Sequence, residues 1–244
     1  MSEHDQASGA LAKLDAVRAK RGYLLPHHGL LAISAPEMLE AYDAAYTAMT
    51  LTQRRLTKKD KEFVWLAVLI STEEALATHH IAKFRDAGGS DDEIEGAARI
   101  AALSTGGRSL DFIGDHWRDH LPSFDTRNLR HSLHQAALGE LGISERLLLL
   151  AQAAVAVCLS RWRDLKWSLE DAYAAKIDEF EIAEALELTM FPGSVPNFVE
   201  ACGVWRDLVV SGSVAASPLF ESWARMSGQG GYDEAAGMMD STHG

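Results

Sequence analysis

Apolar residues recur at intervals of three and four along this 244-residue chain, and no stretch alternates between apolar and polar residues. Intervals of three and four place side chains on one face of an α-helix, whereas a half-buried β-strand requires alternation. Two runs, 63–70 and 147–159, are apolar on nearly every side and are predicted to be buried helices. Even the longer run is too short to cross a bilayer. The sequence therefore predicts an all-α fold.

Capping and turn residues divide the chain into separate helices. Thr57 and Ser90 are expected to be N-caps, and Glu93, three residues after Ser90, completes a capping box. The pairs Gly88-Gly89 and Gly106-Gly107 are expected to end helices, because glycine readily adopts the left-handed conformation found beyond a helix C-terminus. The predicted helices cover 7–20, 36–50, 57–70, 73–87 and 91–103, followed by a sixth that ends at 120 and another that begins at 144.

The second half of the chain repeats features of the first at an offset of 88 residues. Glu93-Ile94 falls on Glu181-Ile182, and Trp117-Arg118-Asp119 falls on Trp205-Arg206-Asp207. Because tryptophan is rare, the matched triplet favours a duplicated helical module, with both tryptophans packed in a core. The predicted organisation is an N-terminal helical segment over 1–54, a first repeat over 55–122, a linker over 123–142, a second repeat over 143–210 and a loose tail over 211–244.

The charge of the chain argues against several classes of partner. The sequence has 23 Lys and Arg against 35 Asp and Glu, a net charge of −12. Nucleic acid and anionic membranes both require a basic surface, so neither is expected to bind. Residues 1–9 show no signal peptide, and the two cysteines lie in apolar runs that suit a reducing compartment. A cytoplasmic location is therefore expected.

Three motifs carry a resemblance to a known family. They are Glu62-Phe63-Val64-Trp65-Leu66-Ala67-Val68, Ala77-Thr78-His79-His80 and Ala87-Gly88-Gly89-Ser90-Asp91-Asp92-Glu93-Ile94. In this order they resemble the carboxymuconolactone decarboxylase and alkylhydroperoxidase D-like family, and the resemblance extends over roughly 32–210. It implies the helical fold of that family, duplicated within the chain. It also implies a cofactor-independent lyase that acts on a small carboxylated lactone or an intermediate of aromatic-compound catabolism.

The chain departs from the peroxidase branch of this family, which carries Cys-x2-Cys-x3-His. The corresponding positions here hold Glu73, Leu76 and His80. Without the cysteine pair there is neither a thiolate nucleophile nor a resolving thiol, so a thiol peroxidase activity is not expected. The alternative within the family is a non-thiol, degenerate member that serves as a binding or structural protein.

The histidine pair of the first repeat is the centre of the predicted site. On one continuous helix Glu73 and His80 would share a face, and Glu62 could reach the same cavity from the neighbouring helix. A histidine beside carboxylates is favoured in its protonated form, which suits a general acid. Strict spacing, however, aligns the acidic residue of the family with Lys61, one position before Glu62.

Decarboxylation without a cofactor requires a proton donor and a positive environment for the anion that remains. The substrate implied by the resemblance is a small-molecule carboxylate, and the mechanism needs neither a cofactor nor a metal. The predicted catalytic residues are His80, Glu62, His79 and Glu73, and the predicted substrate-binding residues are Arg85, Lys83 and Trp65.

A third possible function is a metal-dependent enzyme. His116 and His120 are four residues apart, which on a helix places two imidazoles on one face, as a metal site needs. His131 or His134 could supply a further ligand. Two histidines beside a linker are also typical of a plain surface cluster.

The family resemblance also predicts an assembly. Single-copy members form rings, the decarboxylases as hexamers, so a chain with two copies is expected to form a homotrimer that looks like a pseudo-hexameric ring. The two apolar runs favour a partner, because a chain of this size can surround one such helix more readily than two. The competing outcome is a monomer or dimer in which the two copies close on each other.

Overall fold

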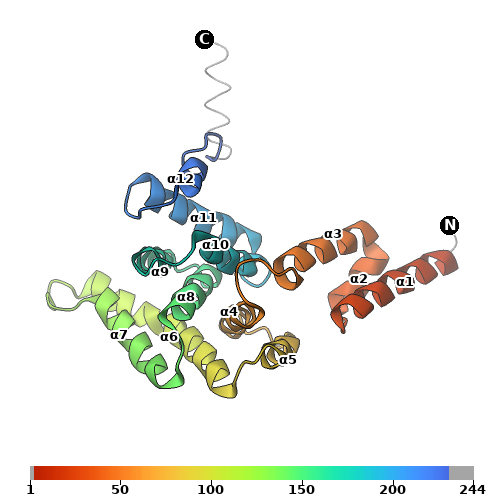
Figure 1. Cartoon of the computed structure of the whole chain (residues 1–244), viewed down its shortest axis with the longest axis horizontal. Helices are drawn as coiled ribbons and strands as arrows, with labels where there is room; N and C mark the ends of the chain where they lie inside the picture. Colours follow the sequence, from red (N-terminus) through yellow and green to blue (C-terminus); the bar gives the residue numbers. More distant parts are fainter. Residues whose placement is uncertain (1–2, 231–244) are drawn as a thin grey trace, which may run out of the picture.

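The computed structural model describes residues 3–230, which form α-helices joined by short loops, with no strand among them (Figure 1). This confirms the predicted all-α fold. The helices are α1 (Glu3–Arg21), α2 (Pro26–Ser34), α3 (Pro36–Tyr46), α4 (Lys58–Ser71), α5 (His79–Asp86), α6 (Asp91–His116), α7 (Thr126–Leu138), α8 (Glu145–Cys158), α9 (Trp162–Ala174), α10 (Glu179–Glu187), α11 (Val195–Val210) and α12 (Pro218–Ala224), with a π-helical turn at Thr47–Leu51 and 3-10 turns at Gly139–Leu141 and Leu188–Met190.

The two apolar runs form the central helices α4 and α8, which pack against each other (Figure 1). Every residue of α4 from Lys61 to Leu69 is buried, and so is every residue of α8 from Leu147 to Val157. Helices α6, α9 and α10 cover the remaining sides of this pair. Each apolar helix is therefore buried within a single chain, and burial of the two does not require a partner.

The N-terminal helices α1, α2 and α3 form an arm that projects from the body of the molecule (Figure 1). The arm has a small apolar core of its own, formed by Ala10, Val17, Ala32 and Leu39. Arg21, at the end of α1, binds Asp43 of α3 through Nε and Nη2, at 3.0 and 2.7 Å from Oδ1. This buried guanidinium fixes the end of α1 against α3, beside the body.

The helix predicted over 73–87 begins six residues later than expected, at His79. Helix α4 ends at Ser71, and Glu73 then adopts a left-handed backbone conformation, with φ of 56°. Residues 72–78 consequently form turns rather than a helix. Glu73 and His80 therefore do not share a helical face, and the prediction that they do was wrong.

The pair Gly106-Gly107 does not end a helix, contrary to the prediction, because α6 continues through both residues to His116. A Cβ atom on Gly107 would lie 2.8 Å from Nη2 of Arg161, whereas Gly106 has open space around it. Gly107 is thus needed for the close approach of a buried arginine. The two glycines alone predict a helix end, because Arg161, the residue that packs against Gly107, lies far along the chain.

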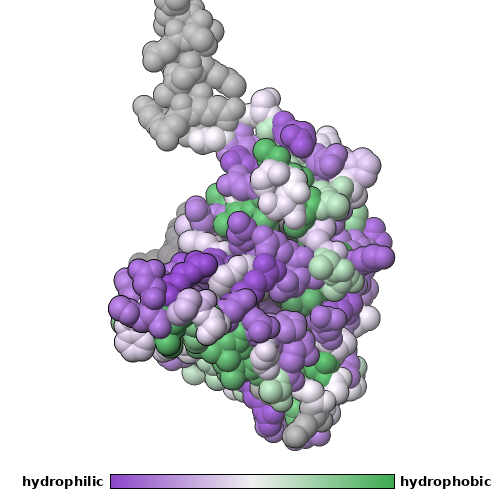
Figure 2. All heavy atoms as spheres, turned by 90° about the vertical axis from the view of Figure 1, so that its left-hand side faces the viewer, coloured by the Kyte–Doolittle hydropathy of each residue, from purple (hydrophilic) through white to green (hydrophobic). Residues whose placement is uncertain are grey.

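Residues 123–142, predicted to be a linker, contain helix α7. Asp125 caps its N-terminus by accepting a hydrogen bond from the backbone N–H of Asn128. Arg130, His134 and Leu138, one turn apart, are buried against the body, and α7 packs along α6. On the face that includes α7, hydrophilic side chains predominate and hydrophobic ones form smaller areas between them (Figure 2).

The two halves of the body share local features at an offset of 87 or 88 residues. Thr57 and Ser144 cap α4 and α8, and Ser90 and Asp178 cap α6 and α10. An ion pair between Lys59 and Glu93 in the first half has its counterpart between Arg146 and Glu181 in the second. These correspondences agree with the predicted duplication, which stays a prediction.

The two tryptophans at equivalent positions differ in environment. Trp205 is buried, but Trp117 is 49% exposed, so the expected shared role in core packing applies only to Trp205. In the segment predicted to be a loose tail, α12 packs along α11, and residues 231–244 lie outside the described part of the chain. Between residues 3 and 230, no helix combines the length and hydrophobicity that crossing a membrane requires.

Candidate active site

The structure brings His80 and Glu62 together in the interior. Glu62 lies on the buried helix α4 and His80 in the first turn of α5, and their exposed fractions are 3% and 2%. Nδ1 of His80 lies 2.6 Å from Oε2 of Glu62. Because an ionised carboxylate can only accept, the imidazole donates this hydrogen bond. The bond fixes the orientation of the ring and leaves Nε2 as the nitrogen that can meet a ligand.

Aromatic rings continue from His80 in two directions. Trp65, one turn after Glu62 on α4, stacks on His80 with ring centroids 4.8 Å apart. The ring centroids of His79 and His80 are 4.3 Å apart, and those of His79 and Tyr23, in the arm, are 4.0 Å apart. The buried pair is therefore held between rings from α4, α5 and the loop that follows α1.

These rings border a cavity of about 420 Å³ between the arm and the body. Its volume lies in the range typical of sites for small molecules. The arm and the body both contribute to its wall, and so does the loop before α11. The lining residues are Arg21, Tyr23, Leu25, Pro26, His27, Tyr42, Tyr46, Trp65, Leu69, Glu74, Leu76, Ala77, His79, His80, Phe191 and Pro192.

The second histidine of the pair is neutral at pH 7. Burial, reinforced by the neighbouring charges of His80, Lys83 and Arg21, lowers the pKa of His79 to about 3. Burial likewise lowers the pKa of His27. These two imidazoles therefore offer uncharged polar groups to the cavity rather than positive charge.

Three of the other predicted site residues lie elsewhere. Glu73 is exposed, in the turn after α4, and does not line the cavity. Arg85 is on the outer side of α5, where it forms an exposed ion pair of 2.7 Å with Asp91. Lys83 is behind the cavity wall, with Nζ 3.5 Å from the hydroxyl of Tyr46, and burial lowers its pKa.

The ambiguity between Lys61 and Glu62 has a structural answer. Lys61 points away from His80 and forms a buried ion pair of 2.8 Å with Glu184 of α10. Its Nζ also donates to the carbonyl oxygen of Thr52. Glu62 is thus the acidic group at the histidine pair. It lies one position after Lys61, the residue that strict spacing aligns with the acidic residue of the family.

The arm residues of the cavity were missed by the sequence analysis. Tyr42 and Tyr46 are one turn apart on α3, a pattern that indicates a shared helical face but not what the face contacts. Phe191 and Pro192 reach the cavity from the second half of the body. The pair His27-His28 belongs to helix α2, and its contacts are set by the fold of the arm.

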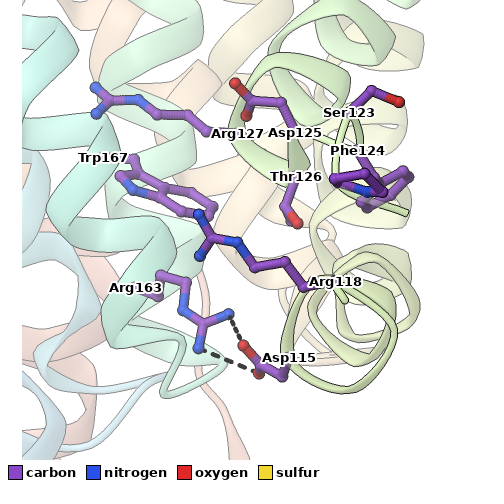
Figure 3. Close-up of a pocket in the computed structure, with 11 residues that line it drawn as sticks. Asp115, Arg118, Ser123, Phe124, Asp125, Thr126, Arg127, Arg163 and Trp167 are labelled. Atoms are coloured by element: carbon purple, nitrogen blue, oxygen red, sulfur yellow. Dashed lines mark hydrogen bonds and ion pairs between the residues drawn. The ribbon is translucent and has the colours of Figure 1, made fainter. Parts of the chain in front are cut away.

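A second hollow, of about 610 Å³, is open between α6, α7 and α9 (Figure 3). Arg118, Arg163 and Trp167 line it, and Arg163 forms an ion pair of 2.9 Å with Asp115. Arg127, at its edge, binds Glu170 and Asp171 on α9. Its lining includes arginines and aspartates but no histidine, so it lacks a group that exchanges protons near neutral pH.

The predicted face of His116 and His120 does not form. His116 is the last residue of α6, and His120 lies in the turn that follows. Within residues 3–230, no group of three or more His, Cys, Asp or Glu side chains is placed to hold a metal ion. The metal-dependent alternative therefore loses the geometry on which it was based.

Neither cysteine is activated. Burial raises the pKa of the Cys158 thiol to about 12 and also raises that of Cys202. Both thiols are protonated at neutral pH and therefore poor nucleophiles.

A model of the carboxymuconolactone decarboxylase family matches residues 36–110 of the chain. The match includes α3, α4 and α5 and most of α6, and with them the pair formed by Glu62 and His80. No curated protein and no solved structure is similar enough to the chain to match it. Over residues 36–110, which is less than a third of its length, the chain is similar to the carboxymuconolactone decarboxylase family.

Proposed function

We propose that the protein is a cofactor-independent lyase that removes CO2 from a small carboxylated lactone or a related ring. The observation that carries this proposal is the hydrogen bond of 2.6 Å between Glu62 and His80 beside a cavity of about 420 Å³. The family match adds the reaction class, since the family takes its name from a decarboxylase.

The reaction requires one proton transfer to carbon. The bond between the carboxylate and the ring breaks, CO2 leaves, and the electron pair passes into the conjugated system of the substrate. Nε2 of protonated His80 then donates its proton to the carbanionic carbon, and solvent returns a proton to the imidazole. In sum, one carboxylate and one proton give the shortened product and CO2.

The surroundings of His80 suit this role. Glu62 holds the imidazole by Nδ1, which leaves Nε2 for the substrate. The stacked Trp65 keeps the ring from turning. An aromatic wall hydrates a bound carboxylate less than water does, and a carboxylate with less hydration is less stable relative to CO2.

The test is the turnover of carboxymuconolactone in D2O by the purified protein. We expect release of CO2 and incorporation of one deuterium at the carbon next to the lactone carbonyl, where the conjugated anion left by CO2 takes up its proton. A protein that binds the lactone without releasing CO2 would instead be the non-thiol binding protein. Release of CO2 without deuterium at the carbon next to the lactone carbonyl would contradict proton donation by an enzyme acid in exchange with solvent.

A further inference from the structure

The proposed reaction creates a negative charge that none of the predicted cations meets. When CO2 leaves, its electron pair passes through the conjugated system to the lactone carbonyl oxygen. Arg85 lies on the outer side of α5, Lys83 lies behind the wall of the cavity, and His79 is neutral. Arg21 lines the cavity, but each nitrogen of its guanidinium already has a partner in the arm. Stabilisation of this oxygen therefore falls to uncharged groups of the lining.

Two phenols in the lining, Tyr23 and Tyr46, form a hydrogen-bonded pair. Their hydroxyl oxygens are 2.8 Å apart. Tyr46 ends α3 and is 5% exposed, whereas Tyr23, in the loop after α1, is half-buried. The pair has two hydroxyl protons, and the bond between the oxygens uses one of them. Within residues 3–230 the other proton has no acceptor, so it is available to a ligand.

A lysine indicates which phenol keeps the available proton. Nζ of Lys83 donates to the hydroxyl oxygen of Tyr46 in a long hydrogen bond of 3.5 Å. A hydroxyl that accepts from one neighbour has a more polarised O–H, so the favoured direction of the next bond is from Tyr46 to Tyr23. Burial raises the pKa of Tyr23, and the hydrogen bond from Tyr46 offsets part of that rise. Tyr23 is therefore protonated at pH 7, and its own proton is the available one.

The pair lies beside the proposed proton donor. The ring of Tyr23 covers that of His79, with centroids 4.0 Å apart, and the ring of His79 lies 4.3 Å from that of His80. Because the first two rings are inclined by only 31°, the Tyr23 hydroxyl, in the plane of its own ring, does not point at the imidazole that it covers. Burial raises the pKa of Tyr46, and the charge of Glu62 acts in the same direction. The phenols and the pair of Glu62 and His80 thus belong to one region of the cavity.

We propose that Tyr23 and Tyr46 form an oxyanion site, in which Tyr23 donates to the enolate oxygen of a ring lactone and Tyr46 positions and polarises Tyr23. As the bond to the carboxylate breaks, the carbonyl oxygen gains charge and its hydrogen bond from Tyr23 strengthens. No proton passes along this bond. His80 protonates the carbon next to the carbonyl, and the carbonyl re-forms. The role in decarboxylation rests on the proposed function, whereas the preference for an oxyanion does not.

4-Nitrophenol tests the site without turnover, because its ionised and protonated forms absorb at different wavelengths. The full chain is titrated with this probe at the pH at which half of the free probe is ionised, and the spectrum of the bound probe gives the ratio of the two forms. We expect the wild type to bind the ionised form about tenfold more tightly than the protonated form, roughly the gain when the acceptor of a hydrogen bond becomes charged.

Three variants that replace a phenol by a phenyl ring assign this preference. Tyr23→Phe should bind the two forms about equally. Tyr46→Phe keeps the Tyr23 proton but removes the group that polarises it, so the preference should fall by about threefold. Tyr173→Phe is the matched control, because its hydroxyl donates to Glu179 outside the cavity, and it should keep the preference of the wild type. Circular dichroism checks that each variant keeps its helices.

The oxyanion site is overturned if 4-nitrophenol does not bind, if the wild type binds its two forms equally, or if Tyr23→Phe keeps the preference. Kinetics separate this proposal from the proposed function. On a lactone that the wild type decarboxylates, Tyr23→Phe should lower kcat by about 10²- to 10³-fold, the effect of losing one oxyanion donor. Preference for the ionised probe without CO2 release would contradict the decarboxylase alone, and full turnover by Tyr23→Phe would contradict the oxyanion site alone.

Discussion

Individual buried side chains set the pH range in which the fold is stable. His134 is 1% exposed, and its Nδ1 donates to the carbonyl oxygen of Arg130. Burial lowers the pKa of His134 to about 4, despite that hydrogen bond. The unfolded chain, with a histidine pKa near 6.5, therefore binds more protons between about pH 6.5 and 4. The contribution of His134 to stability is complete above that range and is lost as the pH falls through it.

We predict that His134→Gln flattens this pH dependence. In the wild type, the free energy of unfolding should fall by about 2 kcal/mol more between pH 7 and 4.5 than in the variant. His116→Gln, at an exposed position, serves as the control. Urea titrations at several pH values give the slopes, and equal slopes for the wild type and His134→Gln would show that His134 is not buried as a neutral group.

The buried ion pair of Lys61 and Glu184 is the second feature at this scale. Their side chains are 4% and 2% exposed, and Glu184 also accepts from the backbone N–H groups of Arg55 and Leu56. Removing one partner of a buried pair leaves the other charge uncompensated, which costs about 3–5 kcal/mol.

We expect Lys61→Met to lower the free energy of unfolding by about 3 kcal/mol. Lys59→Met is the matched control: Lys59 lies two residues away on α4, and its pair with Glu93 is partly exposed, so its loss should cost less than about 1 kcal/mol. Similar losses in the two variants would contradict the distinction between a buried and a surface pair.

At the scale of elements, helix α6 contains two adjacent glycines, and one of them packs closely against a side chain of another helix. Arg161 is nearly buried and binds both Asp164 and Asp111, so its guanidinium cannot easily move away from Gly107. Gly107→Ala should therefore destabilise the fold by about 1–3 kcal/mol. Gly106→Ala, in the same helix with open space, should stabilise it by about 0.5–1 kcal/mol.

Thermal unfolding of the two variants measures this difference directly. A lower Tm for Gly107→Ala and a higher Tm for Gly106→Ala is the expected pair of results. If both substitutions raised the Tm, the close contact with Arg161 would not limit the packing of α6.

The elements also show what a sequence can and cannot predict. The caps Thr57 and Ser90 were predicted correctly, because a cap depends on side chains within three residues. The late start of α5 was not predicted, because it depends on the left-handed backbone conformation of Glu73. The unbroken α6 was not predicted either, because it depends on the packing of Arg161, far along the chain, against Gly107. The position of His80 came from the family resemblance, whereas the arm residues of the cavity follow only from the tertiary fold.

For the whole molecule, the homotrimer remains a prediction. Helices α4 and α8 bury each other, so they no longer argue for a partner. Exposed apolar side chains occur instead on the arm, where Leu30, Ile33 and Met38 are 66%, 79% and 55% exposed. Such a surface is typical of a contact with another chain, and we expect the arm to form it.

Light scattering with Ile33→Asp tests this assembly. The wild type should have a mass near three times 26.6 kDa, and the variant should dissociate. Leu133→Asp, at a half-exposed position on α7, is the control. A wild type that stays monomeric at micromolar concentration would contradict the trimer and leave the cavity as a site within one chain.

The most direct test of the central claim is the turnover number of His80→Gln on a carboxylated lactone that the wild type decarboxylates. Because glutamine cannot donate a proton as an acid, kcat should fall by about 10²- to 10⁴-fold while the helical content stays unchanged. His116→Gln, outside the cavity, should keep the activity of the wild type. Full turnover by His80→Gln would contradict the claim that this buried histidine, held by Glu62, is the proton donor.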